Sequence, residues 1–257
     1  MFSINTERIW AINSYIQLKG QVHLRDLMAL YPNISAMTIR RDIDYLERMG
    51  HVVRTRGGAK SINHLTHIKE DAYSKRAGLH NEAKMIIASK AAEANLTGDA
   101  GAIYFDSGTT VMSFVSIMQP GDIFAVTSGP NIALELCRGR TSRTVLLGGA
   151  IAPDNLSISG NAAVEQVKNI NISTAIIATS GYSVGAGFTI GNFDESELKR
   201  TVISKASRIA VLMDISKIGH NLPYTFAHMS DIDYLICDNA LPAEVVQAAR
   251  QSNVKVL

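Results

Sequence analysis

The chain has 257 residues, of which 46% are hydrophobic and 19% are charged, a composition that supports a folded core and excludes wholesale disorder. Its longest apolar runs, such as residues 174–179 and 209–213, have the length of strands, so we expect no membrane-spanning helix. Glu7 and Arg8 interrupt the first residues early, so we expect no secretory leader.

The two cysteines, Cys137 and Cys237, lie a hundred residues apart. They form neither a disulfide framework nor a Cys/His spacing that would bind a metal ion. We therefore expect both to be buried apolar thiols, and we expect no metal site and no cofactor. This cysteine usage fits the reducing cytoplasm.

Charge is distributed unevenly along the chain. Residues 1–60 contain nine Lys or Arg and five acidic residues, a net charge of +4, whereas the remainder carries −2. A basic DNA-binding module joined to a mildly acidic domain would produce this distribution. A solvated charged surface would produce it equally well, so charge alone leaves both interpretations open.

The first sixty residues are expected to begin with two helices. Asn5 or Thr6 can cap the first helix, whose three isoleucines at spacings of three and four share one face, and Gly20 ends it. A short second helix covers residues 24–28. It stops at the turn around Pro32, because proline cannot continue a helix.

A third helix and a β-hairpin complete this segment. Ser35 can cap the third helix, whose apolar residues recur at spacings of four and three, and Gly50 ends it. The β-rich residues 52–56 are followed by Gly57 and Gly58, a pair suited to a tight turn. We therefore expect a winged helix-turn-helix domain over residues 1–60.

Residues 61–82 are polar and irregular, and we expect a connector there that is helical in part near Tyr73 and Arg76. From residue 83 onward, apolar strand-sized runs alternate with helix-like segments, which predicts an α/β domain with a mostly parallel sheet over residues 83–257. The expected strands are residues 102–105, 123–126, 144–147, 174–178, 209–213 and 234–237.

The start of the third helix carries short polar side chains and arginines. In a helix-turn-helix, this turn enters the major groove, where such side chains read base edges and contact phosphates. The alternative is a generic three-helix bundle with a charged face, and helix geometry alone does not decide between them. The residues expected to contact DNA are Arg25, Ser35, Ala36, Met37, Thr38, Arg40 and Arg41, with Arg54 and Arg56 in the hairpin.

Residues 8–59 resemble the N-terminal domain of the DeoR family of bacterial regulators. The resemblance rests on the run T-I-R-R-D-I at residues 38–43 and on R-G-G-A at residues 56–59. It implies that the protein binds a double-stranded DNA operator. We expect Asp42 to be structural, pairing with or orienting a neighbouring arginine, and not to touch DNA. In two departures from the family, the turn at residues 31–34 is one residue longer, and Arg56 stands where histidine is common.

In the expected α/β domain, five polar or glycine-rich clusters each follow an expected strand. Ligands bind beyond the carboxyl ends of the strands in open parallel sheets, so these clusters predict one polar, anion-binding crevice. The residues expected to line it are Asp106, Ser107, Gly108, Thr109, Thr110, Thr127, Ser128, Gly148, Gly149, Gly181, Glu195 and Lys217.

The motif D-S-G-T-T at residues 106–110 lies between an expected strand and an expected helix. Glycine lets the backbone approach a ligand closely, while the helix N-terminus and the neighbouring hydroxyls offer donors to an anion. This chemistry suits a phosphate group. The same hydroxyls could instead cap the helix, and the two roles are compatible.

Residues 76–256 resemble the effector domain of the DeoR family, which is related in fold to ribose-5-phosphate isomerase. The resemblance implies that a phosphorylated sugar binds there. The chain has Thr-Ser-Gly at residues 127–129, where many members have Thr-Asn-Ser, and its glycine-rich residues 185–193 form either a mobile lid or a long turn. The matching residues are Asn81, Lys84, Asp106 to Thr110, Thr127, Gly148, Gly149, Gly181, Gly185, Glu195, Asp214, Ser216, Lys217 and Gly219.

Three hypotheses follow. The first is a repressor of a carbohydrate operon, a homodimer or homotetramer that is controlled by a phosphosugar bound in part by Glu195 and Lys217. The second is a sugar-phosphate isomerase with Glu195 as base, although the acidic and glycine-rich motifs of those enzymes are missing here. The third is a DNA-binding protein whose second domain only assembles subunits. Glu195 could also serve simply to charge the first turn of a helix.

Overall fold

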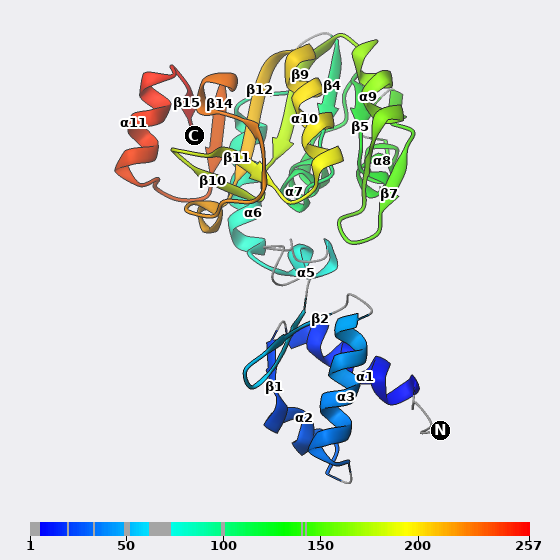
Figure 1. Cartoon of the computed structure of the whole chain (residues 1–257). Coiled ribbons are helices and arrows are strands. Elements are labelled where there is room, and N and C mark those ends of the chain that lie inside the picture. Colours follow the sequence, from blue (N-terminus) through cyan, green and yellow to red (C-terminus); the bar gives the residue numbers. More distant parts are fainter. Residues whose placement is uncertain are drawn as a thin grey trace. The chain divides into compact units, whose positions relative to one another are not determined.

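The computed structural model of the protein describes residues 6–19, 21–32, 34–48, 52–61, 73–98, 101–139, 141 and 143–257. The chain divides into two compact units, residues 1–69 and 70–257 (Figure 1). Several features expected from the sequence lie outside the described residues, namely the roles of Asn5, Gly20 and Gly50 and residues 62–72 of the connector.

The first unit contains the three helices and the hairpin that the sequence predicted. A short strand that the sequence analysis missed, β1, pairs antiparallel with β3, so the sheet has the order β1-β3-β2. This arrangement is a winged helix-turn-helix. The elements are α1 (Thr6–Lys19), β1 (Gln21–His23), α2 (Leu24–Leu30), α3 (Ala36–Arg48), β2 (Val52–Thr55) and β3 (Gly58–Ser61).

The core of the first unit confirms the predicted apolar faces. The isoleucines of α1 and the apolar residues of α3 are buried together, and residues of β1, α2, β2 and β3 complete the cluster. Gly58 is needed for this packing, because a Cβ atom there would lie 2.0 Å from the carbonyl oxygen of Val22 in the paired strand β1. The hairpin turn falls at residues 56–57, one residue earlier than expected.

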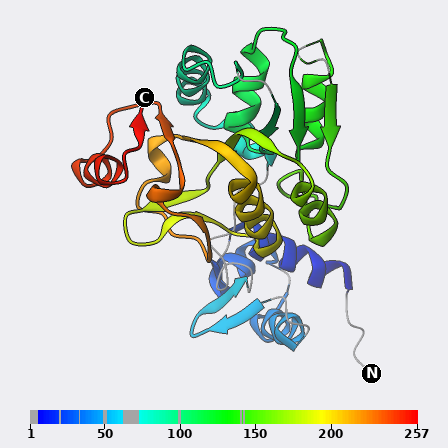
Figure 2. The same cartoon turned by 90° about the horizontal axis from the view of Figure 1, so that it is seen from above.

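The second unit is built on a seven-stranded sheet with the order β15-β14-β12-β9-β4-β5-β6, in which every neighbouring pair is parallel. All six expected strands are present, two of them with the predicted bounds. They are β4 (Ala102–Phe105), β5 (Phe124–Thr127), β6 (Arg143–Leu146), β9 (Ile172–Ala178), β12 (Ala206–Met213) and β14 (Tyr234–Cys237), and the C-terminal β15 (Lys255–Val256) extends one edge (Figure 2).

Helices cover both faces of this sheet, as predicted. Apolar residues of α6, α7 and α8 share one core cluster with the sheet, while those of α9, α10 and α11 share the other, with α10 in front of the sheet in Figure 1. The helices are α5 (Tyr73–Gly78), α6 (Asn81–Glu93), α7 (Thr109–Ile117), α8 (Pro130–Leu136), α9 (Asn161–Lys168), α10 (Phe193–Lys205), η1 (Ile215–Lys217), η2 (Met229–Asp231) and α11 (Ala243–Gln251).

Two smaller sheets were not anticipated. β7 (Ala150–Ala152) and β8 (Ser157–Ser159) form one antiparallel pair. β10 (Gly181–Ser183), β11 (Gly187–Ile190) and β13 (Tyr224–Ala227) form the other sheet. The glycine-rich residues 185–193, interpreted as a lid or a long turn, therefore belong to the β10–β11 hairpin and the start of α10.

The chain winds in two directions from the middle of the large sheet. From β4 it continues outward through β5 to β6, and from β9 it continues the other way through β12 to β14. The loops that follow β4 and β9 therefore separate at the point where the direction reverses. Ligands of open parallel sheets bind at this point, outside the carboxyl ends of the strands.

The structure changes two expectations about the second unit. Residues 73–78 and 81–93 are helical and belong to the compact unit that begins at Glu70, so this unit starts earlier than the expected boundary at residue 83. Cys137 is exposed, and the expectation that it is buried was wrong. Cys237 is buried in β14, where desolvation raises the pKa of its thiol to about 12.

Candidate functional site

The first candidate surface is the exposed face of α3. Ser35 caps this helix as predicted, because the Thr38 N–H donates to Ser35 Oγ at 3.2 Å, and the two hydroxyl oxygens lie 2.9 Å apart. The helix then presents exposed Met37, Arg40 and Arg41, while Ile39 is buried beneath them. One face of α3 is therefore apolar and packed, and the other is basic and open to solvent.

The hairpin brings further arginines to this face. Arg40, Arg54 and Arg56 line one groove of about 140 Å³, together with Gly57 and Gly58 at the turn. Arginines from the helix and from the hairpin, which are separate in the sequence, thus line the same groove. Such a groove matches the phosphate oxygens of a nucleic-acid backbone, which arginine binds through its planar donors.

Ion pairs with α3 orient the hairpin. Arg54 pairs with Asp44 at 2.6 Å, and the backbone N–H of Arg54 donates to Glu47 Oε1 at 2.9 Å. Arg54 therefore joins β2 to α3 as well as lining the groove. Arg56, at the turn, is exposed. Arg25 is exposed in α2, and its Nε lies 3.6 Å from Asp26 Oδ1.

Asp42 has the structural role that was expected of it. Its carboxylate accepts from Arg8 Nε at 2.7 Å and from Arg8 Nη2 at 3.2 Å, and the pair is largely buried between α1 and α3. The hydrogen bond to Asp42 raises the pKa of Arg8, against the opposing effect of burial. The partner is 34 residues away and not one of the adjacent arginines of α3.

The second candidate site lies at the carboxyl ends of β4 and β9. Residues 106–110 leave β4, and Gly108 is the N-cap residue of α7. A Cβ atom at Gly108 would lie 2.5 Å from the Cβ of Ala178 in β9, so only glycine allows the loop to approach that strand. The N-terminus of α7 is thereby held at the reversal point of the sheet.

Gly108 is the N-cap residue of α7, and because glycine has no side chain it cannot cap the helix. Ser107, Thr109 and Thr110 lie beside it in the sequence and are buried. The first N–H groups of a helix have no partner within the helix, and together with hydroxyl groups they form the chemistry that binds phosphate and other anions. The start of α7 therefore has the composition of the predicted cradle.

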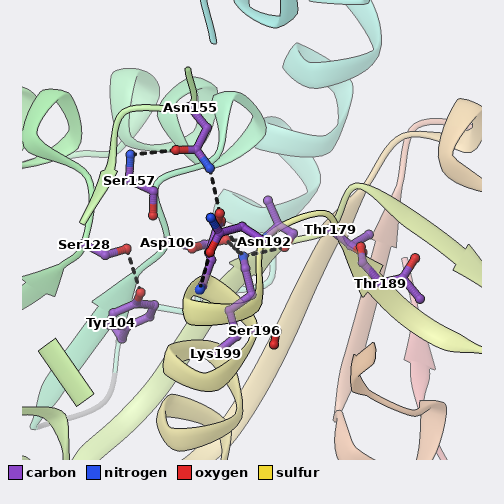
Figure 3. A network of polar contacts seen from close by, with 12 residues as sticks. Tyr104, Asp106, Ser128, Asn155, Ser157, Thr179, Thr189, Asn192, Ser196 and Lys199 are labelled. Carbon is purple, nitrogen blue, oxygen red and sulfur yellow. Dashed lines mark hydrogen bonds and ion pairs between the residues drawn. The ribbon is translucent and has the colours of Figure 1, made fainter. Parts of the chain in front are cut away.

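A buried ion pair anchors the cradle (Figure 3). Lys199 Nζ, from α10, contacts the Asp106 carboxylate and donates to the Ala178 carbonyl oxygen at 2.9 Å. The Ala178 N–H in turn donates to Asp106 Oδ2 at 2.9 Å. The Asp106 and Lys199 side chains are each 2% exposed, so Asp106, which we expected to contact a ligand, ties β4 to β9 and α10.

Glu195 joins the same network from the first turn of α10. Its Oε2 accepts from Asn155 Nδ2 at 2.7 Å, and its Oε1 lies 3.8 Å from Lys199 Nζ. Asn192 caps the helix, because its Oδ1 accepts the Glu195 N–H at 3.0 Å. Glu195 is therefore both an acid in the first turn of α10 and a buried acceptor beside Asn155 and Lys199.

The loop after β5 packs against the cradle. A Cβ atom at Gly129 would lie 3.0 Å from Ser107 Cα, which places the two loops in contact. Ser128 Oγ lies 2.8 Å from the hydroxyl of Tyr104, and burial raises the pKa of that phenol well above its ordinary value. The Thr127 hydroxyl accepts the Gly129 N–H at 3.0 Å, so Thr127 shapes this turn.

Three other predicted ligand residues have packing roles. Both backbone polar groups of Gly148 bond to the side chain of Gln166, at 3.0 and 3.1 Å. A Cβ atom at Gly149 would lie 2.7 Å from the Ser159 carbonyl oxygen, and one at Gly181 would lie 2.3 Å from that of His220.

Lys217 lies at the carboxyl end of β12, in η1. Its charge acts on Lys84, whose pKa is lowered by burial and, to a smaller extent, by Lys217 and Arg76, while Asp214 opposes the shift. Asp214 Oδ1 accepts the Ser216 N–H at 3.1 Å and so caps η1. Lys84 and Lys217 therefore place positive charge near the carboxyl end of β12.

Sequence reasoning missed four polar residues of the network at the carboxyl ends of β4 and β9. They are Tyr104, Asn155, Ser157 and Lys199, all buried. A signal existed for Lys199 alone, since it stands four residues after Glu195 and shares a helix face with it. Asn155 and Ser157 belong to the β7–β8 hairpin, whose position depends on long-range packing.

Two protein families match the chain. Residues 8–64 match the DeoR-like helix-turn-helix domain, and residues 79–239 match the DeoR C terminal sensor domain. A DNA-binding domain joined to a sensor domain defines a class of protein, the ligand-responsive transcriptional regulators. This chain belongs to the DeoR family of those regulators.

Several relatives resemble the chain along most of its length. The putative aga operon transcriptional repressor of Escherichia coli O157:H7 is 28% identical over 98% of this chain and 93% of its own. The transcriptional regulator GlpR of Haloferax volcanii is 30% identical over 87% and 86%. The transcriptional repressor GlcR of Bacillus subtilis is 30% identical over 90% and 88%.

Solved structures resemble the fold only distantly. Ribose 5-phosphate isomerase A of Methanocaldococcus jannaschii is 14% identical, with a TM-score of 0.36 over 52% of this chain and 53% of its own. The delta subunit of eIF2B from Chaetomium thermophilum is 9% identical, with a TM-score of 0.45 over 81% and 66%. In the part of the chain that the structure describes, none of the helices has the length and apolarity to cross a bilayer.

Proposed function

We propose that this protein is a repressor of a carbohydrate operon, and that a phosphorylated sugar bound at the carboxyl edge of the large sheet controls its affinity for DNA. The observation that carries the proposal is the start of α7, where the N-cap residue Gly108 and three buried hydroxyl residues stand at the carboxyl end of β4. Two relatives named as repressors, one of the aga operon, support the direction of the regulation.

The polar groups of the crevice suit a sugar phosphate in two parts. The cradle offers donors to a dianionic phosphate, and Glu195 and Asn155 beside it offer an acceptor and an amide to sugar hydroxyls. Lys199 pairs with Asp106 beneath the loop, so the Asp106 carboxylate has its own counter-ion. Lys217 is a further candidate for the anion, at the β12 end of the same edge.

We further propose that the protein acts in the cytoplasm as a homodimer or homotetramer that the second unit assembles. One small helix-turn-helix contacts few bases, and two-fold symmetric dimers match palindromic half-sites. Sedimentation equilibrium of the full chain at micromolar concentration tests this, and a strict monomer contradicts it. We propose no enzymatic activity, because Glu195 already accepts from Asn155 and lies beside Lys199, which does not favour it as a free base.

A thermal-shift screen tests the sensor proposal. The full chain is heated with ribose 5-phosphate, glucose 6-phosphate, fructose 1-phosphate, their unphosphorylated parents and inorganic phosphate. A ligand that binds only the native state raises the melting temperature by mass action. We expect one phosphosugar to raise it more than its parent sugar and more than phosphate, and no shift with any phosphosugar contradicts the proposal.

A pair of matched variants locates the ligand. Ser107→Ala removes a hydroxyl from the cradle, whereas Ser116→Ala removes an exposed hydroxyl from the other end of α7, where it bonds only to the Ser113 carbonyl oxygen. The first variant should lose most of the shift and the second should keep it. Operator fragments selected from random DNA by the full chain then show whether the same phosphosugar releases DNA.

A further inference from the structure

The short helix α5 is the first described element of the second unit, and it follows the segment that leads from the DNA-binding unit. It has only six residues, too few for a stable helix on its own. Contacts at both of its ends hold it at the carboxyl edge of the large sheet, where the turn at residues 154–157 also contacts Glu195.

The start of α5 is tied to two loops of that edge. The Tyr73 N–H donates to the Asp154 carbonyl oxygen at 2.7 Å, in the turn between β7 and β8. Asn131, in the first turn of α8, donates from its Nδ2 to the Tyr73 hydroxyl at 2.5 Å. Burial raises the pKa of Tyr73, so the phenol stays protonated at neutral pH and keeps this contact.

The end of α5 is tied by a buried lysine. Lys84 Nζ, from α6, donates to the carbonyl oxygens of Arg76 and Leu79, the latter at 2.6 Å, and Lys84 is 4% exposed. A cation at a helix C-terminus satisfies carbonyl groups that have no partner within the helix. The charges of Asp214 and Lys217 also act on Lys84. The helix therefore extends from the β5 side of the edge to the β12 side.

The turn that holds Tyr73 also belongs to the crevice. Asp154 contacts α5, while the next residue, Asn155, donates to Glu195 and accepts the Ser157 N–H at 3.2 Å. Leu156, between them, has a φ of 53°, a left-handed conformation that is uncommon for leucine. Among the described residues, the buried Ser157 Oγ has no hydrogen-bond partner. A strained turn with an unsatisfied hydroxyl joins the ligand site to α5.

We infer that α5 is a strap that couples occupancy of the crevice to the segment leading to the DNA-binding unit, with Tyr73 as the positioning residue. The inference rests on the proposed function, because it assumes a ligand at the crevice. A ligand that bonds to Ser157, Asn155 or Glu195 changes the energy of the turn at residues 154–157. The change reaches Tyr73 through the Asp154 carbonyl group and so biases the position of α5.

The test uses Tyr73→Phe in the full chain, which removes the hydroxyl but keeps the ring and the backbone bond. Tyr234→Phe is the matched control. The half-buried ring of Tyr234 contacts Lys255, and it lies in β14, which pairs with the edge strand β15. Operator affinity is measured with and without the phosphosugar that gives the largest thermal shift, and the ratio of the two affinities measures the coupling.

We expect Tyr73→Phe to reduce that ratio by about 2- to 12-fold, the range for one hydrogen bond, while the affinities for operator alone and for phosphosugar alone change by less than about twofold. The control should leave the ratio unchanged. A ratio that is equal in the wild type and in Tyr73→Phe overturns the role of Tyr73. A loss of operator affinity in the absence of phosphosugar also overturns it.

Hydrogen exchange of the wild-type full chain provides a second readout. With the stabilising phosphosugar, peptides that cover residues 73–79 and 154–158 should change their exchange together, and inorganic phosphate should give a smaller change. If the phosphosugar stabilises the protein but the α5 peptide is unaffected, the strap is wrong and the sensor proposal stands. If no phosphosugar stabilises the protein, both fall.

Discussion

The exposed face of α3 and the crevice of the second unit use the same residue types in opposite ways. On the exposed face of α3, Arg40 and Arg41 are open to solvent, and the Arg25 and Asp26 side chains of α2 are 84% and 44% exposed. In the crevice, Lys199 and Asp106 are each 2% exposed and hold three elements together. Exposed charges contribute little to stability and stay available for a partner, whereas buried charges shape a site.

The sharpest way to test this contrast is to remove the buried cation. Lys199→Met should lower the free energy of unfolding by about 3–5 kcal/mol, because the Asp106 carboxylate is left buried without its counter-ion. Lys168→Met, which breaks the exposed pair with Glu165, should cost less than about 1 kcal/mol. Urea unfolding of both variants measures the difference, and similar losses in the two would contradict the contrast.

The glycine of the cradle should show the next largest effect. Gly108→Ala places a Cβ atom 2.5 Å from that of Ala178, and we expect about 1–3 kcal/mol of destabilisation together with loss of the phosphosugar-induced thermal shift. At Gly185 a Cβ atom meets no other atom within 4 Å, so Gly185→Ala should retain both properties. Retention of the full shift by Gly108→Ala would move the ligand away from the start of α7.

Substitutions on the exposed face of α3 should have the opposite pattern. They should weaken operator binding and leave the free energy of unfolding almost unchanged. Arg40→Ala should weaken operator binding by about 1–3 kcal/mol and change the unfolding free energy by less than about 0.5 kcal/mol. Arg138→Ala, an exposed arginine of the second unit that pairs with Glu135, is the control for both measurements. Unchanged operator affinity in the Arg40 variant would remove α3 from the recognition role.

The hairpin should affect salt dependence and not sequence choice. If Arg56 contacts a phosphate, Arg56→Ala should reduce the slope of log affinity against log salt by about 1, and by the same amount on any DNA sequence. Titrations at several salt concentrations with operator and unrelated DNA measure this. A loss confined to the operator would assign Arg56 to base reading.

The two cysteines provide the smallest and simplest comparison. A thiol reagent should label exposed Cys137 in the native protein and Cys237 only after unfolding. Because the pKa of Cys237 is about 12 in the fold, the unfolded chain loses this proton first as pH rises. Stability should therefore be constant below the thiol's ordinary pKa and fall as pH rises above it. Equal labelling of both thiols at neutral pH would contradict the packing of β14.

Much of the fold was predictable because local patterns carry it. The isoleucine spacing of α1 and α3 and the six apolar runs of the sheet follow directly from helical and strand periodicity. The short strands β1, β7 and β8 were missed, since three residues carry too little periodicity. The helical character near Tyr73 and Arg76 was predicted, but the position of α5 was not, because a six-residue helix depends on contacts from Asn131, Asp154 and Lys84.

The sequence by itself determined which residue types follow each strand, and hence that residues 106–110 would stand at the carboxyl edge of a parallel sheet. Only the tertiary structure decided what each side chain does there. Asp106 faces Lys199, 93 residues away, and Gly181 packs against the backbone of His220. Local patterns record the period of one element, whereas the partners of a buried polar group are set by which distant elements the fold packs against it.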